Sequence, residues 1–386
     1  KMKNAIIKVE NNHTSKGNIS FFSLIQNFKE KEIIGLNSRD KNDITRGLGF
    51  EYEKVIDHSR IRFSTETHLS GVDWNIDSNI VINDRQSSIF RGSFEIYKPE
   101  NEKKFQFKDL KFIFSKHRVT DISDTLNSYA ISGNSWDNNN TQFTASFLNK
   151  QPNKKMLLYV NLGNVFRVPS VNELINNQVN SFPLSLNKLV PEQKTMYEFG
   201  MKINNDNQAG EAYYNAVISG FTYYYFGKIK QIYFSGNPIK YPINYGQASL
   251  SGIEMSLRYQ PNRDWINLKS HLSNYVFSDP SAFQLQPDRI FRNIISITNK
   301  WLGIEIVHRS ESSRKITIIG SNSLPVETML DPITNFDINI HRDFQVSFFR
   351  TSFSLSAKNL NSGSQAIEGI SIYDRRYSLN ISVVLK

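Results

Sequence analysis

Residues 252–260, GIEMSLRYQ, are the stretch that decides the fold of this chain. Apolar and polar side chains alternate along it, with Ile253, Met255, Leu257 and Tyr259 set against Glu254, Ser256, Arg258 and Gln260. Successive side chains of a β-strand point to opposite faces, so this alternation collects the apolar groups on one face. The segment is therefore predicted to be a strand with one apolar and one polar face.

The same period of two returns in segments far apart along the chain. Residues 377–385 place Tyr, Leu, Ile, Val and Leu on one face, with Val384 as the single apolar exception on the other. Residues 336–341 and 60–69 alternate in the same way. Alternation of this kind is typical of half-buried strands, and it predicts an all-β chain.

Short and long connections alternate between these strands. Short polar turns are expected at residues 57–59, 99–104, 150–155, 204–208, 261–264, 299–300 and 342–343. Longer polar loops are expected at residues 29–44, 70–87, 117–139, 164–192, 235–245, 279–288, 310–333 and 359–373. All the short connections can therefore lie at one end of an antiparallel meander and all the long ones at the other, as in outer-membrane barrels.

This arrangement predicts a transmembrane antiparallel up-and-down β-barrel, with about seventeen strands of about ten residues each in this chain. An odd number cannot close a bacterial barrel, and the downward direction of the first segment implies at least one strand before Lys1. A soluble sandwich array or propeller would also alternate, but neither requires every long loop at one end. In the barrel, Leu257 is expected to face lipid and Arg258 the lumen.

Composition favours a membrane barrel over other classes. No run of about 18 apolar residues exists, which excludes a transmembrane helix and leaves a closed barrel as the only way to span a membrane. The chain has no cysteine, which excludes disulfides and thiolate metal ligands. Its formal charge of +10 comes from basic residues scattered among acids, so nucleic acid is not an expected partner.

Three motifs stand in order between residues 166 and 254. FRVPSVNEL at residues 166–174 contains Phe166, Arg167, Pro169 and Glu173, and VPEQKTMYEFG at residues 190–200 contains Pro191, Glu192, Tyr197, Glu198 and Gly200. The third motif contains Asn244, Gly246, Ala248, Gly252, Ile253 and Glu254. In order and spacing these residues resemble the TonB-dependent receptor family, whose barrels carry an FRxPxxxEL stretch, a Pro-Glu pair and similar Tyr-Glu-x-Gly and Gly-hydrophobic-Glu strands.

The resemblance implies a barrel of about 22 strands, of which residues 1–386 would be the C-terminal part, a single partial domain. It implies an outer-membrane location among lipid and lipopolysaccharide, and a plug domain, missing from this chain, that connects the barrel to the TonB energy-coupling complex. The implied activity is uptake of a scarce small-molecule solute, such as an iron chelate, cobalamin or haem, without a cofactor. The last residues, Val384-Leu385-Lys386, depart from the terminal aromatic residue usual in the family.

Local geometry gives the motif residues structural interpretations. Ser170 and Glu173 have the spacing of a capping box, so a short helix is expected to begin there, while Pro169 holds the preceding residue extended. Arg167 and Glu173 are interpreted as structural rather than ligand-binding. Gly252 is expected to permit a close approach or a bend in its strand.

No catalytic or metal-binding motif stands out. The seven histidines show no spacing typical of zinc or haem ligation, and no Gly-rich phosphate loop, G-x-S-x-G elbow or H-E-x-x-H helix is present. The chain is therefore predicted not to be an enzyme, although a hydrolase assembled from different strands stays open as the least favoured alternative. A passive porin-like channel is the second alternative.

Residues of the expected outer loops could contact the solute, because aromatic faces and cations suit an iron chelate or another anionic solute. The candidates are His117, Arg118, Trp136, Lys240, Tyr241, Tyr245 and Arg309. For each of them the alternative is a solvated loop or a lipopolysaccharide contact. The aromatic residues 223–226 and Trp265, at strand ends, are expected to form interfacial girdles.

Overall fold

The computed structural model describes residues 2–13, 17–34, 37–56, 59–76, 81–98, 105–122, 134–151, 154–178, 187–205, 212–234, 237–261, 265–299, 301–319, 325–346, 349–361, 365–367, 370–372 and 375–385. Within these ranges the chain is built almost entirely of strands, which confirms the all-β prediction. No helix in them is long and apolar enough to cross a membrane.

The strands in the first part of the chain are β1 (Met2–His13), β2 (Gly17–Ile34), β3 (Asn37–Ile56), β4 (Ser59–Ile76), β5 (Val81–Tyr97), β6 (Phe105–Ile122), β7 (Ser135–Gln151), β8 (Lys154–Arg167), β9 (Glu192–Asn204), β10 (Tyr213–Phe234) and β11 (Asn237–Gln260). Those that follow are β12 (Ile266–Phe277), β13 (Arg289–Thr298), β14 (Gly303–Glu311), β15 (Arg314–Ile319), β16 (Pro325–Leu330), β17 (Ile333–Val346), β18 (Phe349–Lys358), β19 (Gln365–Ile367), β20 (Ile370–Ile372) and β21 (Arg376–Leu385). The short helices are α1 (Val171–Gln178) and η1 (Pro280–Ala282).

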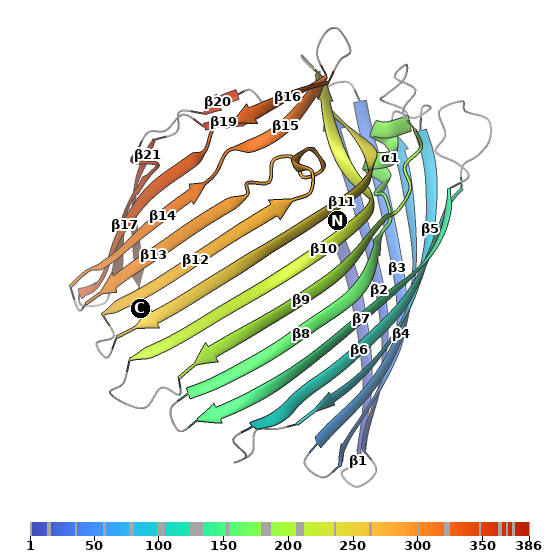
Figure 1. Ribbon diagram of the computed structural model, residues 1–386, viewed down its shortest axis with the longest axis horizontal. Helices are drawn as coiled ribbons and strands as arrows, with labels where there is room; N and C mark the ends of the chain where they lie inside the picture. Colours follow the sequence, from blue (N-terminus) through green and yellow to red (C-terminus); the bar gives the residue numbers. More distant parts are fainter. Residues whose placement is uncertain are drawn as a thin grey trace. The chain divides into compact units, whose positions relative to one another are not determined.

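The strands form one antiparallel, up-and-down sheet of 19 strands (Figure 1). Consecutive strands pair with each other from β1 through to β6, and again from β11 through to β14. β14 then pairs with β17 past the β15–β16 hairpin, and β18 pairs with β21 past the β19–β20 hairpin. Without β15 and β16 the described sheet keeps seventeen of its 19 strands, the number predicted from the sequence. Within the described ranges the sheet is not closed.

The strands are longer than the sequence predicted, and several expected loops are strand. β3 has 20 residues and β11 has 24, against an expectation of about ten. Residues 29–44 and 70–87 pair within β2–β3 and β4–β5 as far as Ile34↔Asn37 and Ile76↔Val81. Ladder hydrogen bonds join backbone groups, so they continue through polar sequence once the register is set. Polar composition therefore marks the end of the apolar band rather than the end of the strand.

The remaining expected loops also contain regular structure. Residues 164–192 contain α1, residues 279–288 contain η1, and residues 310–333 contain the β15–β16 hairpin. Residues 123–133, within the expected loop 117–139, lie outside the described residues.

The chain forms two compact units, each with an apolar and a polar sheet face. Unit 1 is Lys1–Phe147, Val160–Tyr197 and Tyr223–Ala248, and unit 2 is Leu148–Tyr159, Glu198–Thr222 and Ser249–Lys386. In unit 1 an aromatic row crosses β3 to β6 through directly opposed residues, namely Tyr52, Phe63, Phe94 and Phe112. We call the face bearing this row the apolar face of unit 1, and the opposite face its polar face.

In unit 2 the corresponding row runs from β11 to β17 through Tyr259, Leu268, Ile295, Ile306 and Ile338. This is the apolar face of unit 2, although Ser270, Asn293 and His308 form a polar row on it. Strand alternation places Leu257 on this face and Arg258 on the polar face, as predicted. Side chains of the apolar face are exposed, with Leu257 at 45% and Ile381 at 64%, which suits a surface that meets lipid.

Candidate functional site

The FRVPSVNEL motif forms the end of β8 and the first turn of α1. The Ser170 hydroxyl accepts a hydrogen bond from the Glu173 N–H at 3.3 Å, and the Glu173 carboxylate accepts one from the Ser170 N–H at 2.8 Å. This reciprocal pair is the predicted capping box. Arg167 Nη1 also lies 3.0 Å from both carboxylate oxygens of Glu173, so the side chain of Arg167 ties the end of β8 to α1.

Glu192 of the second motif connects this turn to β10. Its side chain is buried, and Oε2 accepts a hydrogen bond from the Ile229 N–H at 2.8 Å. The same oxygen lies 3.7 Å from Arg167 Nη2 and 3.9 Å from Lys228 Nζ. A buried carboxylate satisfied in this way fixes the positions of three strands, because removing one partner would leave a charge uncompensated.

Asn244 of the third motif joins the same region of unit 1. Its side-chain amide donates to the carbonyl oxygens of Gly227, at 2.6 Å, and Val190, at 3.0 Å, while its Oδ1 accepts from the Val190 N–H at 2.8 Å. Gly227 has φ +61°, a left-handed conformation that glycine adopts without strain. The three motifs therefore meet in one network, which we call the motif network: Arg167, Glu173, Glu192, Lys228 and Asn244.

Two glycines of the motifs are covered by tyrosine rings within unit 2. The Tyr159 ring lies against Gly200 and its hydroxyl donates to Glu198 at 3.1 Å. In the same way the Tyr275 ring lies against Gly252, where a Cβ would stand 2.7 Å from it, and its hydroxyl donates to Glu254 at 2.8 Å. The close approach expected at Gly252 is therefore present.

The other motif residues make fewer contacts. The Phe166 N–H donates to Asn140 Oδ1 at 2.6 Å, and the Pro169 carbonyl accepts from Arg85 Nη1 at 2.7 Å. The Tyr197 ring stands edge-on to Tyr224 with centroids 6.2 Å apart. Pro191 precedes β9, and Gly246 has open space around it.

The residues predicted to contact a solute do not form one cluster. His117 and Arg118 lie on opposite faces of β6, because they are adjacent in a strand. The Trp136 ring lies 5.7 Å below the Arg85 guanidinium, which itself pairs with Asp121 at 2.7 Å. Their contact with a solute stays a prediction.

The other predicted contact residues are engaged within the protein. Tyr241 is buried, at 3% exposure, and Lys230 Nζ stands 4.5 Å from the centroid of the Tyr245 ring. Lys240 Nζ lies 5.5 Å from the Tyr233 ring centroid. Arg309, in unit 2, forms an ion pair with Glu311.

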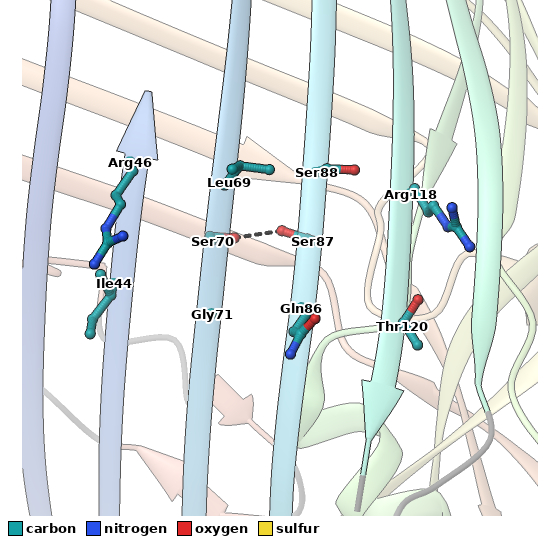
Figure 2. A pocket seen from close by; sticks show the side chains of 10 residues that line it. All are labelled: Ile44, Arg46, Leu69, Ser70, Gly71, Gln86, Ser87, Ser88, Arg118 and Thr120. Atoms are coloured by element: carbon teal, nitrogen blue, oxygen red, sulfur yellow. Dashed lines mark hydrogen bonds between the residues drawn. The ribbon is translucent and has the colours of Figure 1, made fainter. Parts of the chain in front are cut away.

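Arg118 belongs to a groove on the apolar face of unit 1, which is not where solute contact was predicted. Six residues along β3 and β6 from the aromatic row, Arg46 lies opposite Leu69 and Arg118 lies opposite Ser88. A cavity of about 580 Å³ lies between them, with Arg46 at one side and Arg118 at the other (Figure 2). We call this cavity the Arg46–Arg118 groove.

Unit 2 brings together cations that the sequence patterns did not single out. Lys269, His271 and Arg292 lie on the polar face of β12 and β13, next to Arg309 of β14. The alternation around residue 258 gives the face on which each residue lies. Which of these basic residues lie opposite one another depends on the register between the strands. Among the described residues, no group of three or more His, Asp or Glu side chains could hold a metal ion.

An antiparallel up-and-down sheet with one exposed apolar face and one polar face is typical of the wall of a transmembrane β-barrel. Residues 35–360 match the family model described as TonB dependent receptor-like, beta-barrel, and the chain belongs to this family. The family consists of receptors and transporters rather than enzymes, and membership implies an outer-membrane location. No curated protein matches the chain.

Solved structures share this fold at low sequence identity. Pseudomonas aeruginosa FpvA, in complex with heterologous pyoverdines, has a TM-score of 0.70 and 11% identity over 99% of this chain and 55% of that chain. The copper transporter OprC gives 0.68 and 11% over 99% and 64%, and the unliganded ferric citrate transporter FecA gives 0.61 and 13% over 100% and 61%. At such identities the likeness shows the fold alone. This chain spans between 55% and 64% of the length of these three chains.

Proposed function

We propose that this chain is the barrel wall of an outer-membrane receptor that imports a scarce small-molecule solute with energy supplied through the TonB complex. The observation that carries the proposal is the family match over residues 35–360. The apolar and polar sheet faces support it, because a transport wall needs one face for lipid and one for a watery route. The solute class is an iron chelate or a comparable complex, as the names of FpvA and FecA state for those proteins.

In this proposal the solute is captured at the outer loops and moves along the polar face after a plug domain is displaced. The motif network would hold α1 and the ends of β8 to β11 in fixed positions at the outer end. Its buried Glu192 and the charge-assisted contact of Arg167 Nη1 with both carboxylate oxygens of Glu173 support such a positioning role. The residues of the network contact each other and the backbone of Val190, Gly227 and Ile229, so they would act on the shape of the outer mouth.

We also propose that the Arg46–Arg118 groove binds phosphate groups of lipopolysaccharide. Both side chains are exposed on the apolar face of unit 1, six residues along β3 and β6 from the aromatic row. Guanidinium groups at the edge of an apolar band suit anionic head groups, and they bind phosphate with bidentate geometry. The Arg46→Gln/Arg118→Gln variant is expected to carry less lipopolysaccharide phosphate after purification. Arg62→Gln, on the polar face, is the matched control; equal phosphate content in all three proteins would contradict this proposal.

Uptake in cells tests the main proposal. A strain lacking the gene is grown with single ferric chelates as the iron source, with and without the restored gene, and radioactive iron uptake is measured. We expect the restored gene to support saturable uptake that stops when the proton gradient is dissipated or the TonB protein is removed. Uptake that needs neither energy nor TonB would instead identify a passive porin-like channel and would overturn the proposal.

A further inference from the structure

The polar face of unit 2 sets basic residues directly opposite basic residues, and two of the pairs, Arg258–Lys269 and Arg292–Arg309, join side chains that are charged at pH 7. Register places Arg258 opposite Lys269, His271 opposite Arg292, and Arg292 opposite Arg309. Directly opposed residues of antiparallel strands have neighbouring Cβ atoms, so like charges there destabilise the pair. We call these five residues the β11–β14 cation cluster. Such an arrangement costs folding stability unless something negative binds to it.

Acidic side chains of the described chain do not neutralise the centre of this cluster. Arg309 at its edge pairs with Glu311, and Arg258 lies 5.7 Å from the centroid of the Tyr213 ring. Lys269 and Arg292, in contrast, have no carboxylate at ion-pair distance within the described ranges.

The nearest acids of the same face are engaged elsewhere. Glu254 accepts the hydroxyl hydrogen bond of Tyr275. Asp337 accepts from the Asn359 N–H at 2.8 Å, and Glu305 accepts from the Asn339 amide at 3.4 Å. The positive charge at Lys269 and Arg292 is therefore left available.

A cavity opens at these side chains. Its volume is about 280 Å³, and its lining includes Ser256, Arg258, Lys269, His271 and Arg292. Alternation places all five side chains on the polar face, so donors converge on one space from three strands. This volume lies just under the roughly 300 Å³ at which pockets for drug-sized ligands begin, so it suits a small ion rather than a larger solute. Hydroxyl, ammonium and guanidinium groups together match an anion with several oxygens.

We propose that the β11–β14 cation cluster is a binding site for a small polyvalent anion, of the carboxylate or phosphate class, on the polar face of the wall. The inference rests on the proposed uptake function, because that function makes the polar face the wall of the solute's route. The bound anion offsets the repulsion between opposed cations, which explains why Lys269 and Arg292, at the centre of the cluster, have no acidic partner among the described residues. A site of this kind favours negatively charged solutes over neutral ones during passage.

Calorimetric titration of the intact protein in maltoside micelles at low ionic strength tests the site. The probes are inorganic pyrophosphate and citrate. We expect saturable binding that Lys269→Gln/Arg292→Gln weakens at least about tenfold, and that added salt weakens by screening. The charge-conserving Arg292→Lys should retain most of the affinity. Heat-modifiable migration in gels establishes that each variant is folded.

The matched control is Arg62→Gln, which removes an arginine from the polar face of unit 1 that is already paired with Glu53 at 2.8 Å. It should leave pyrophosphate affinity unchanged. Absence of saturable binding to the unmodified protein, or equal losses in Arg62→Gln and the double variant, would overturn the site. A double variant that binds both probes as tightly as the unmodified protein, but melts at a different temperature, would also overturn the site. The cluster would then face an acidic protein surface rather than a small anion.

Uptake measurements separate this inference from the function on which it rests. If the unmodified protein imports an anionic chelate with energy and the double variant imports it equally well, the site is wrong while the function stands. If the unmodified protein binds pyrophosphate but supports no energised uptake of any solute, the function is wrong while the site stands. Slower uptake of anionic chelates than of neutral ones, in the double variant alone, supports both.

Discussion

The polar faces of β3–β5 and β11–β14 follow the same alternation, yet their charges are arranged in opposite ways. On β3–β5, Glu53 lies opposite Arg62 and Glu66 opposite Arg91, and these form ion pairs at 2.8 and 2.7 Å. On β11–β14, each basic residue of the cation cluster lies opposite another. Alternation thus decides on which face a charge lies, whereas strand register decides what the charge meets.

The two arrangements have different energetic consequences. Opposite charges across a strand pair contribute about 0.2–1 kcal/mol, and like charges destabilise the pair. The polar face of β3–β5 therefore stabilises itself, while that of β11–β14 keeps a positive field for a ligand.

The largest expected effect on stability comes from placing a charged residue on the apolar face of the sheet. Leu257→Arg introduces a cation on the apolar face and should destabilise the protein, by about 2–4 kcal/mol if this position lies near the bilayer midplane and by less toward the interface. Equilibrium unfolding in urea, with the protein folded into phosphatidylcholine vesicles, measures the change.

Arg258→Leu is the companion variant at the neighbouring position. It should change the free energy of unfolding by less than about 1 kcal/mol, because it removes a cation opposite Lys269 from the polar face. Equal losses of stability in the two variants would show that the faces are wrongly assigned.

Much of the fold could be predicted because it depends on local pattern. The alternation at residues 252–260 gives the faces of Leu257 and Arg258, and the spacing of Ser170 and Glu173 gives the capping box. The number of strands in the up-and-down sheet follows from the recurrence of that alternation. Strand length could not be predicted, because β2 and β3 keep pairing through the polar residues 29–44 by backbone hydrogen bonds alone.

The candidate sites were less accessible from sequence, because they depend on contacts between distant segments. Nothing in the order of residues indicates that Glu192 accepts from the Ile229 N–H, or that Lys269 faces Arg258. Arg118 was expected with His117 at a solute site, yet one step along β6 moves it to the apolar face. To find the Arg46–Arg118 groove from sequence, the face of each residue near Leu69 and the register between the strands would both have to be known.

A further variant disrupts the ion pairs on the polar face of β3–β5. Glu53→Lys turns an ion pair into a repulsion, because Arg60 and Arg62 both contact this carboxylate, at 3.4 and 2.8 Å. We expect a loss of about 1 kcal/mol in the same unfolding experiment, and no change in pyrophosphate affinity. The loss should shrink in 1 M salt, where the Debye length is about 3 Å. A loss independent of salt would assign the effect to packing rather than charge.

The smallest effect on stability, and the most discriminating, comes from giving β11–β14 an opposed acid–base pair like those of β3–β5. Lys269→Glu places a carboxylate opposite Arg258, as Glu53 lies opposite Arg62, and should raise the free energy of unfolding by about 0.5 kcal/mol while abolishing pyrophosphate binding. Lys269→Gln removes the repulsion without adding a pair, so its stability should fall between that of Lys269→Glu and the unmodified protein. Stability and anion affinity would then change in opposite directions across one position, as expected if the cluster exchanges folding stability for binding. A rise in stability with unaltered affinity would instead mean that the opposed cations repel each other without serving a ligand.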